Sequence, residues 1–397
     1  MSDLLTIEDA LARIVERAQP LPVEMVAVAD AARRILREPP LSRVDLPPFA
    51  SSAMDGFAVR AAETPGELPV AFRVAAGGPA SQPLPLGATA GIATGAAVPE
   101  GADAVVPIER VVDHGTRVEI LDAASFGQHI RPQGGDVREG DVVANVGTRI
   151  GAAQIGALAA VGIAEIRCSA RPRVAVLATG SELRLAGEPL VHGQIYESNR
   201  AMIAAVLRTA GADVEVLPVV EDDEPAHRAA LERGLDADVL VTSGGVSMGP
   251  HDLVRRIAGD LGVEEVFWGV AIKPGKPLSF GVRGATLVFG LPGNPVSSLV
   301  GSLVFVSPAL LARQGVTGVE LGYEYGRAAT PLRRNPHRDE FVRARRLPDE
   351  EGVRLEPVSG QESHMIVRAA TADALIHVSR GDGEIAAGAP VRFLTLD

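Results

Sequence analysis

From about residue 173 onward, short apolar strands alternate with helical segments, and this alternation limits the possible folds more than any other feature of the sequence. The expected strands RVAVLATG, DVEVLPVV and DVLVTSGG are rich in Val and Leu on both faces, as strands buried between two helix layers are. Helical segments with one apolar face separate them, for example SNRAMIAAVLRTAG and EPAHRAALERGL. Such βαβ units give a mostly parallel sheet, so we expect a three-layer α/β domain over residues 171–315.

The segments that flank this domain have different patterns. Residues 47–143 are rich in Gly, Pro and Val and have little helical periodicity, which predicts an inserted β-rich domain. The stretches around it look helical over 5–38 and 150–161, and we expect them to form a linker domain from residues 1–46 and 144–170. Residues 325–397 contain several short strand-like runs and are expected to form a small C-terminal domain resembling a β-barrel.

Composition argues against several classes of protein. A net charge of −12 disfavours nonspecific binding of nucleic acid, which requires clustered cations. The single cysteine, Cys168, rules out an intrachain disulfide and indicates the cytoplasm. Residues 284–312 carry no charged side chain, but prolines interrupt the apolar run, so we expect a buried strand and helix and no membrane span. The first 18 residues have the pattern of an amphipathic helix and not of an export signal.

The two lysines of the chain lie three residues apart. Of 38 basic residues 36 are arginines, whereas Lys273 and Lys276 both belong to the motif KPGK. Codon bias explains the scarcity of lysine but not this clustering. A lysine ammonium is a compact charge that enters a narrow site where a planar guanidinium does not fit. We therefore expect both lysines to bind a phosphate or another oxyanion, the alternative being an exposed turn.

Four loops follow directly after expected strands. Ligands of parallel sheets bind at the carboxyl ends of the strands, so these loops should form one site. In the third loop, Ser243, Gly244 and Gly245 would let backbone N–H groups approach an anion. The loops are TGSE (179–182), EDDE (221–224), TSGGVSMGPHD (242–252) and GLPGNP (290–295).

The stretch GVSMG, residues 245–249, matches the nucleophile elbow G-x-S-x-G of serine hydrolases. In that motif the serine lies on a sharp turn directly between a strand and a helix. Here the expected strand ends near Thr242, five residues before Ser247, so the loop is too long and open for an elbow. Later histidines, His337 and His364, leave a catalytic triad as an alternative. We expect Ser247 to be a loop residue or an anion contact.

Three acidic residues follow three different strands and should converge at one edge of the sheet, namely Glu182, Asp222 and Asp252. Converging carboxylates repel one another unless a cation lies between them. Mg²⁺ takes one or two carboxylates together with phosphate oxygens, so we expect these acids to bind Mg²⁺. For each acid taken alone the alternative is a helix N-cap, a role favoured for Asp222 in EDDEP, but the three acids together shift the balance toward a metal site.

Seven motifs together resemble one family, the molybdopterin molybdenumtransferases, MoeA-like enzymes related to the E domains of gephyrin. The resemblance spans essentially the whole chain. It implies an enzyme that inserts molybdate into adenylated molybdopterin, releases AMP and requires Mg²⁺. It also implies a homodimer with active sites shared between subunits, and a possible transfer complex with the molybdopterin adenylyltransferase. The motifs occur in the order SSAMDGFAV, IATGAAVPEGADAVVP, HIRPQGGDV, LATGSEL, VTSGGVSMGPHD, IKPGKP and GLPGNPVSS.

The resemblance further implies functional residues. The catalytic positions would be Asp55, Thr94, Asp136, Glu182, Asp222, Asp252 and Lys273. The substrate-binding positions would be Ser243, Gly244, Gly245, Ser247, Lys273, Lys276, Pro292, Gly293, Asn294 and Pro295.

Two positions depart from the family pattern, because Ser181 replaces an aspartate and Gly269 replaces a lysine. The choice between molybdate and tungstate stays open. So do two other functions, a molybdopterin adenylyltransferase and a noncatalytic pterin-binding scaffold.

Overall fold

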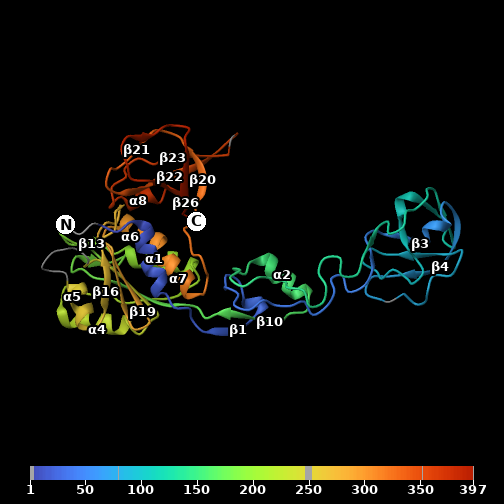
Figure 1. The fold of residues 1–397 in the computed structure, drawn as a ribbon, viewed down its shortest axis with the longest axis horizontal. Coiled ribbons are helices and arrows are strands. Elements are labelled where there is room, and N and C mark those ends of the chain that lie inside the picture. Colours follow the sequence, from blue (N-terminus) through green and yellow to red (C-terminus); the bar gives the residue numbers. More distant parts are fainter. Residues whose placement is uncertain (1–3, 79, 246–252, 351, 397) are drawn as a thin grey trace. The chain divides into compact units, whose positions relative to one another are not determined.

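The computed structural model describes residues 4–78, 80–245, 253–350 and 352–396 (Figure 1). The chain divides into two compact units. Unit 1 comprises Met1–Glu24 and Ser169–Asp397, and unit 2 comprises Met25–Cys168. The expected combination of an α/β domain with β-rich domains before and after it is confirmed.

A six-stranded sheet forms the centre of unit 1. Its order is β14-β11-β15-β19-β18-β16, in which β18 runs antiparallel to both of its neighbours and the other five strands run parallel to one another. The mostly parallel sheet expected from the βαβ pattern is therefore confirmed. The strands are β11 (Arg173–Ala178), β14 (Asp213–Val216), β15 (Val239–Ser243), β16 (Glu264–Trp268), β18 (Ser279–Arg283) and β19 (Thr286–Leu291).

Helices cover both faces of this sheet, because alternate residues of its strands belong to two different cores. Val174 and Val176 of β11 pack in a core with α1, α3, α6 and α7, whereas Ala175 and Leu177 pack in a core with α4 and α5. Each helix contributes an apolar face. The helices are α1 (Ile7–Arg17), α3 (Asn199–Thr209), α4 (Glu224–Gly234), α5 (Leu253–Asp260), α6 (Pro295–Gly301), a π-helical segment η4 (Ser302–Val306) and α7 (Ser307–Arg313).

The continuous helix Pro295–Arg313 is the one helix within the described ranges that is long and apolar enough to cross a membrane. Its mean hydropathy is 1.8, but 72% of the apolar window is buried inside unit 1. The helix therefore serves as a core element, as expected for residues 284–312. Together with β19 it frames the loop that carries GLPGNP.

The C-terminal part of unit 1 is a small closed barrel. Strand pairs close a ring in the order β22-β23-β20-β26-β24 and back to β22. A two-residue strand, β17 (Ile272–Lys273), pairs in parallel with the start of β22. The ring strands are β20 (Glu324–Ala328), β22 (Asp339–Asp349), β23 (Gly352–Pro357), β24 (Ala374–Val378) and β26 (Pro390–Thr395), with a short pair β21 (Leu332–Arg333) and β25 (Glu384–Ile385) and the helix α8 (Ile366–Ala369).

Unit 2 contains a second six-stranded sheet, of order β6-β3-β5-β4-β8-β7. Its apolar core includes Phe57, Val106 and Ile120. The strands are β3 (Gly56–Val59), β4 (Gly66–Val74), β5 (Thr89–Ile92), β6 (Ala104–Pro107), β7 (Val111–Asp113) and β8 (Arg117–Ile120), with two short pairs, β1 (Val23–Ala27) with β10 (Glu165–Ser169) and β2 (Ser51–Ser52) with β9 (Ile130–Arg131).

The helix expected over residues 5–38 is wrong beyond Arg17. Only α1 is an α-helix in this stretch, and after Pro20 and Pro22 the chain continues as the strand β1. Proline removes a backbone donor and fixes φ, so two prolines in three residues prevent the helix from continuing. The second expected helix, 150–161, is present as α2 (Ala152–Ala160).

Candidate functional site

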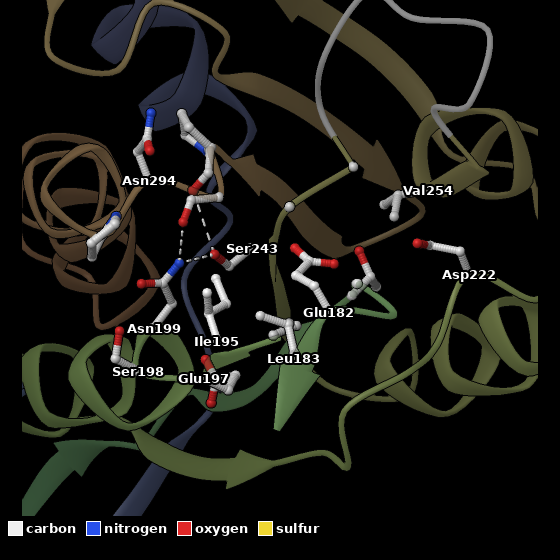
Figure 2. A pocket seen from close by; sticks show the side chains of 18 of the residues that line it. Glu182, Leu183, Ile195, Glu197, Ser198, Asn199, Asp222, Ser243, Val254 and Asn294 are labelled. Carbon is white, nitrogen blue, oxygen red and sulfur yellow. Dashed lines mark hydrogen bonds between the residues drawn. The ribbon is translucent and has the colours of Figure 1, made fainter. Parts of the chain in front are cut away.

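A cavity of about 950 Å³ lies at the carboxyl ends of the parallel strands of unit 1. The expected loops after β11, β15 and β19 all line it, as do Asp222 and the start of α3. Figure 2 shows Glu182 and Asp222 on one side of this cavity and Asn199 on the other. The arrangement follows from the sheet topology, because neighbouring parallel strands deliver their loops to the same edge.

Two positions after β15 require glycine, because their φ angles are positive and because neighbouring atoms leave no room for a Cβ. Gly244 has φ +93°, and a Cβ added there would lie 2.8 Å from the carbonyl oxygen of Thr179. Gly245 has φ +66°, and its Cβ would lie 2.5 Å from Cγ2 of Val254. Both positions favour glycine because L side chains rarely adopt positive φ. The expected anion contacts Gly244 and Gly245 thus line the cavity with bare backbone.

Buried hydrogen bonds hold the loops after β15 and β19 together. The side-chain amide of Asn199 donates to Oγ of Ser243 over 2.8 Å and to the carbonyl oxygen of Gly293 over 2.7 Å. Ser298 on α6 donates its hydroxyl to the carbonyl oxygen of Pro292. Ser243 is 2% exposed, so its hydroxyl fixes neighbouring loops within the cavity wall. Asn199 has this central place but was not among the predicted site residues.

The acids Glu182 and Asp222 both line the cavity, as their positions after two different strands predict. Ser181 connects their loops, because its backbone N–H donates to Oδ2 of Asp222 over 3.3 Å and its Oγ accepts from the N–H of Asp222 over 2.9 Å. The N-cap role favoured for Asp222 is wrong. Asp223 caps α4, since its carboxylate accepts from the N–H of Ala226, which leaves Asp222 at the cavity.

The donor set suits Mg²⁺ bound jointly with a substrate. Within the described ranges, no group of three His, Cys, Asp or Glu side chains is placed to hold a metal ion by itself. Glu182, Glu197 and Asp222 line the cavity, but the nearly buried carboxylate of Glu197 is paired with Arg200. Glu182 and Asp222 therefore remain for Mg²⁺, which commonly uses one or two carboxylates plus phosphate oxygens. The predicted residues Ser247 and Asp252 lie outside the described residues.

A second pocket of about 480 Å³ adjoins the first. The two share Pro277, Pro292, Asn294 and His364 as wall residues. The basic side chains of Lys273, Lys276 and Arg338 line the second pocket. The four residues of GLPGNP predicted to bind substrate, Pro292, Gly293, Asn294 and Pro295, all line the main cavity.

A loop of the C-terminal barrel completes the second pocket, and a buried arginine shapes this loop. Arg343 is 1% exposed, and its guanidinium donates to the carbonyl oxygens of Gly360, Glu362 and Met365. Gln361, Glu362, Ser363 and His364 of the same loop line the pocket. Sequence reasoning missed Arg338 and this loop as site elements. The only available signal was His364, which was considered solely as a triad partner for Ser247.

Unit 2 carries the three remaining predicted residues. Asp55 and Thr94 are neighbours, because the backbone N–H of Thr94 donates to Oδ1 of Asp55 over 2.7 Å. Asp136 lies on a loop tied down by Asp45, which accepts from the N–H of Glu139 and the side chain of Gln133. These hydrogen bonds hold the pKa of Asp45 below its usual value. Asp55, Thr94 and Asp136 are all exposed.

Comparisons with known proteins cover the whole chain. Residues 5–162 match the MoeA N-terminal region (domain I and II), residues 175–312 a probable molybdopterin binding domain, and residues 325–396 the MoeA C-terminal region (domain IV). A molybdopterin molybdenumtransferase of Haemophilus influenzae is 34% identical over 396 residues, with 98% of each chain covered. Molybdopterin molybdenumtransferase 2 of Mycobacterium tuberculosis is 36% identical, with 94% of each covered.

Solved structures agree with the sequence matches. A crystal structure of the molybdopterin biosynthesis MoeA protein from Pyrococcus horikoshii OT3 superposes with a TM-score of 0.84 at 26% identity and covers 100% of both chains. Another structure of a MoeA protein from Pyrococcus horikoshii has a TM-score of 0.79 at 31% identity, with 99% of each chain covered.

Proposed function

Because the chain belongs to the molybdopterin molybdenumtransferase family and is thus a transferase of molybdenum cofactor biosynthesis, we propose that it inserts molybdate into adenylated molybdopterin and releases AMP. One observation carries the proposal. A large cavity with two exposed carboxylates, Glu182 and Asp222, adjoins a smaller pocket with three basic side chains, so two substrates of different size and charge fit side by side.

The larger cavity suits the adenylated pterin. Its volume of about 950 Å³ is at the upper end of ordinary ligand sites. The bare backbone at Gly244 and Gly245 allows close approach of a phosphate group. Glu182 and Asp222 would hold Mg²⁺ against the phosphate oxygens, and Asp252 would complete this set. When bound, Mg²⁺ supplies positive charge at the phosphoanhydride that is cleaved.

The smaller pocket suits the oxyanion. Lys273, Lys276 and Arg338 give it a positive field, which an anion such as molybdate requires. The shared wall at Pro277, Pro292, Asn294 and His364 brings the two pockets into contact. The protein's contribution to the reaction is then to orient the oxyanion next to the pterin and to neutralise the charge of both substrates.

A release assay tests this function. The protein is mixed with adenylated molybdopterin, Mg²⁺ and molybdate, and AMP is followed by chromatography. Glu182→Gln removes a metal-binding charge and should lower the rate of AMP release by about 100-fold or more. Asp213→Asn removes the same charge at the start of β14, far from the carboxyl ends of the strands, and should leave the rate unchanged.

Three outcomes would contradict the proposal. Folded protein that releases no AMP when molybdate is added would not be a molybdate-inserting enzyme. Consumption of ATP with molybdopterin, without any need for molybdate, would identify an adenylyltransferase. Tight pterin binding without turnover would leave the scaffold role.

We further propose that the active form is a cytoplasmic homodimer in which Asp55, Thr94 and Asp136 of one subunit serve the cavity of the other. Their exposure, together with the hydrogen bond between Thr94 and Asp55, supports this role. A transfer complex with the molybdopterin adenylyltransferase would deliver the adenylated substrate directly.

A further inference from the structure

We propose that Glu340 is a positioning residue that fixes the ammonium of Lys273 at the wall of the second pocket and thereby sets how strongly this pocket binds an oxyanion. The inference rests on the proposed function, because it concerns the same pocket. Nζ of Lys273 lies 3.0 Å from Oε1 of Glu340. Lys273 lines the pocket and Glu340 does not, so Glu340 acts through the lysine.

The backbone places these two side chains next to each other. Lys273 is the last residue of β17, which pairs in parallel with the start of β22. In this register Ile272 is opposite Asp339, and Lys273 is opposite Glu340. The pairing joins the KPGK segment of the α/β domain to a barrel strand, so the barrel supplies the partner of a pocket lysine.

Glu340 also connects to the second cation of the pocket. Its Oε1 accepts a hydrogen bond from the side-chain amide of Asn335 over 3.2 Å. Oδ1 of Asn335 in turn accepts from the backbone N–H of His337 and of Arg338. One carboxylate therefore holds Lys273 directly and the turn that carries Arg338 indirectly.

The start of β22 is itself firmly held, so the backbone that carries Glu340 stays in place when Lys273 contacts an anion. The N–H of Asp339 donates to the carbonyl oxygen of Ala271 over 2.9 Å. Oδ1 of Asp339 lies 3.2 Å from Nε2 of His377 and accepts a hydrogen bond from the N–H of Arg380. Burial raises the pKa of Asp339, but these two bonds outweigh burial and hold it below its usual value. The carboxylate of Asp339 thus stays ionised at neutral pH, and its contacts with His377 and Arg380 continue to hold the start of β22.

The other lysine of the motif, Lys276, has different surroundings. Among the residues that the structure describes, no acidic side chain forms an ion pair with Lys276, which is exposed. The charge of Lys276 is fully available to an anion, whereas the anion competes with Glu340 for Lys273. Removal of the Glu340 charge should then strengthen oxyanion binding, and removal of the whole side chain should release Lys273 from its place.

Calorimetric titration with molybdate, and with sulfate as an analogue, measures this effect directly. Glu340→Gln keeps a hydrogen-bond acceptor and removes the charge, and should lower the Kd about three- to tenfold. Glu356→Gln is the matched control, because Glu356 forms an ion pair with Arg345 elsewhere on the barrel. Its Kd should equal that of the wild type. In a Lys273→Met background, Glu340→Gln should change the Kd much less, since it acts through the lysine.

The kinetics of AMP release provide a second readout. Glu340→Gln should lower KM for molybdate, whereas Glu340→Ala, which frees the lysine, should lower kcat about tenfold. A purely structural role would lower kcat in both variants and leave the Kd of Glu340→Gln unchanged, which would overturn the inference. A wild-type protein that binds no oxyanion would instead contradict the proposed function itself.

Discussion

Single residues of the cavity divide into those that build its wall and those that face its interior. Asn199 belongs to the first group, because it is 8% exposed and both of its N–H bonds are used inside the protein. Its Oδ1 is buried and has no hydrogen-bond partner among the described residues. Glu182 and Asp222 belong to the second group, since they are exposed in the cavity. Substitutions in the two groups should therefore have different consequences.

Asn199→Ala should lower the free energy of unfolding by about 1–3 kcal/mol, because the carbonyl oxygen of Gly293 and the hydroxyl of Ser243 lose their donor. It should also raise KM for the pterin substrate, since the loops after β15 and β19 lose one of the hydrogen-bonded links between them. Urea denaturation and AMP-release kinetics measure the two effects. Asn145→Ala, at an exposed position in unit 2, should change neither. Unaltered stability of Asn199→Ala would show that the loops hold without this amide.

Elements position the site through their ends and their irregularities. The helix that follows GLPGNP begins as α6, passes through the π-helical segment η4 and ends as α7. Two buried serines lie four residues apart on it. Ser298 donates to the carbonyl oxygen of Pro292, whereas Oγ of Ser302 has no partner among the residues described. Ser298 thus stabilises the GLPGNP loop, whereas the buried hydroxyl of Ser302 lowers the free energy of unfolding.

This pair gives a matched prediction for one helix. Ser302→Ala should raise the free energy of unfolding by about 0.5–1.5 kcal/mol, because it removes a buried hydroxyl that forms no hydrogen bond. Ser298→Ala should lower it by about 1 kcal/mol, because a satisfied hydrogen bond is lost. Both variants remove one oxygen atom at a fully buried site. Equal effects in urea denaturation would contradict the assignment.

At the scale of the whole molecule, the predicted functional residues fall into both compact units. Glu182, Asp222 and Lys273 belong to unit 1, and Asp55, Thr94 and Asp136 belong to unit 2. Unit 1 by itself contains both pockets. The proposed homodimer explains why exposed residues of unit 2 would matter to the reaction.

Hybrid dimers test this arrangement. Asp55→Asn and Lys273→Met should each be inactive as homodimers. After subunit exchange in an equal mixture, half of the dimers are hybrids, and one of the two sites in each hybrid has both residues intact. The mixture should recover about one quarter of the wild-type rate of AMP release. An inactive mixture, with exchange verified by mass spectrometry, would place both residues in the site of a single subunit.

Much of the fold followed from local patterns. Short runs rich in Val and Leu on both faces predicted the parallel strands, period-3.6 apolar spacing predicted the helices between them, and the order of motifs predicted the family. Predictions from the sequence were wrong where two neighbouring residues could each perform the same structural role. In EDDEP, either of two adjacent aspartates could cap α4, and the one whose backbone has cap geometry is Asp223. The helix expected over residues 5–38 also ran through Pro20 and Pro22, which are themselves a local signal that ends a helix.

The sequence by itself determined which strands are parallel and which loops share the edge of the sheet, because apolar periodicity and chain direction are local properties. It also placed the two lysines of the chain close together. Only the tertiary structure decided that Glu340, from the barrel 67 residues away, pairs with one of them, and that Arg343 shapes the loop bearing His364. Such pairings depend on how the core of the α/β domain continues into the barrel through Ile272 of β17 and Phe341 of β22, which lie far apart in the sequence.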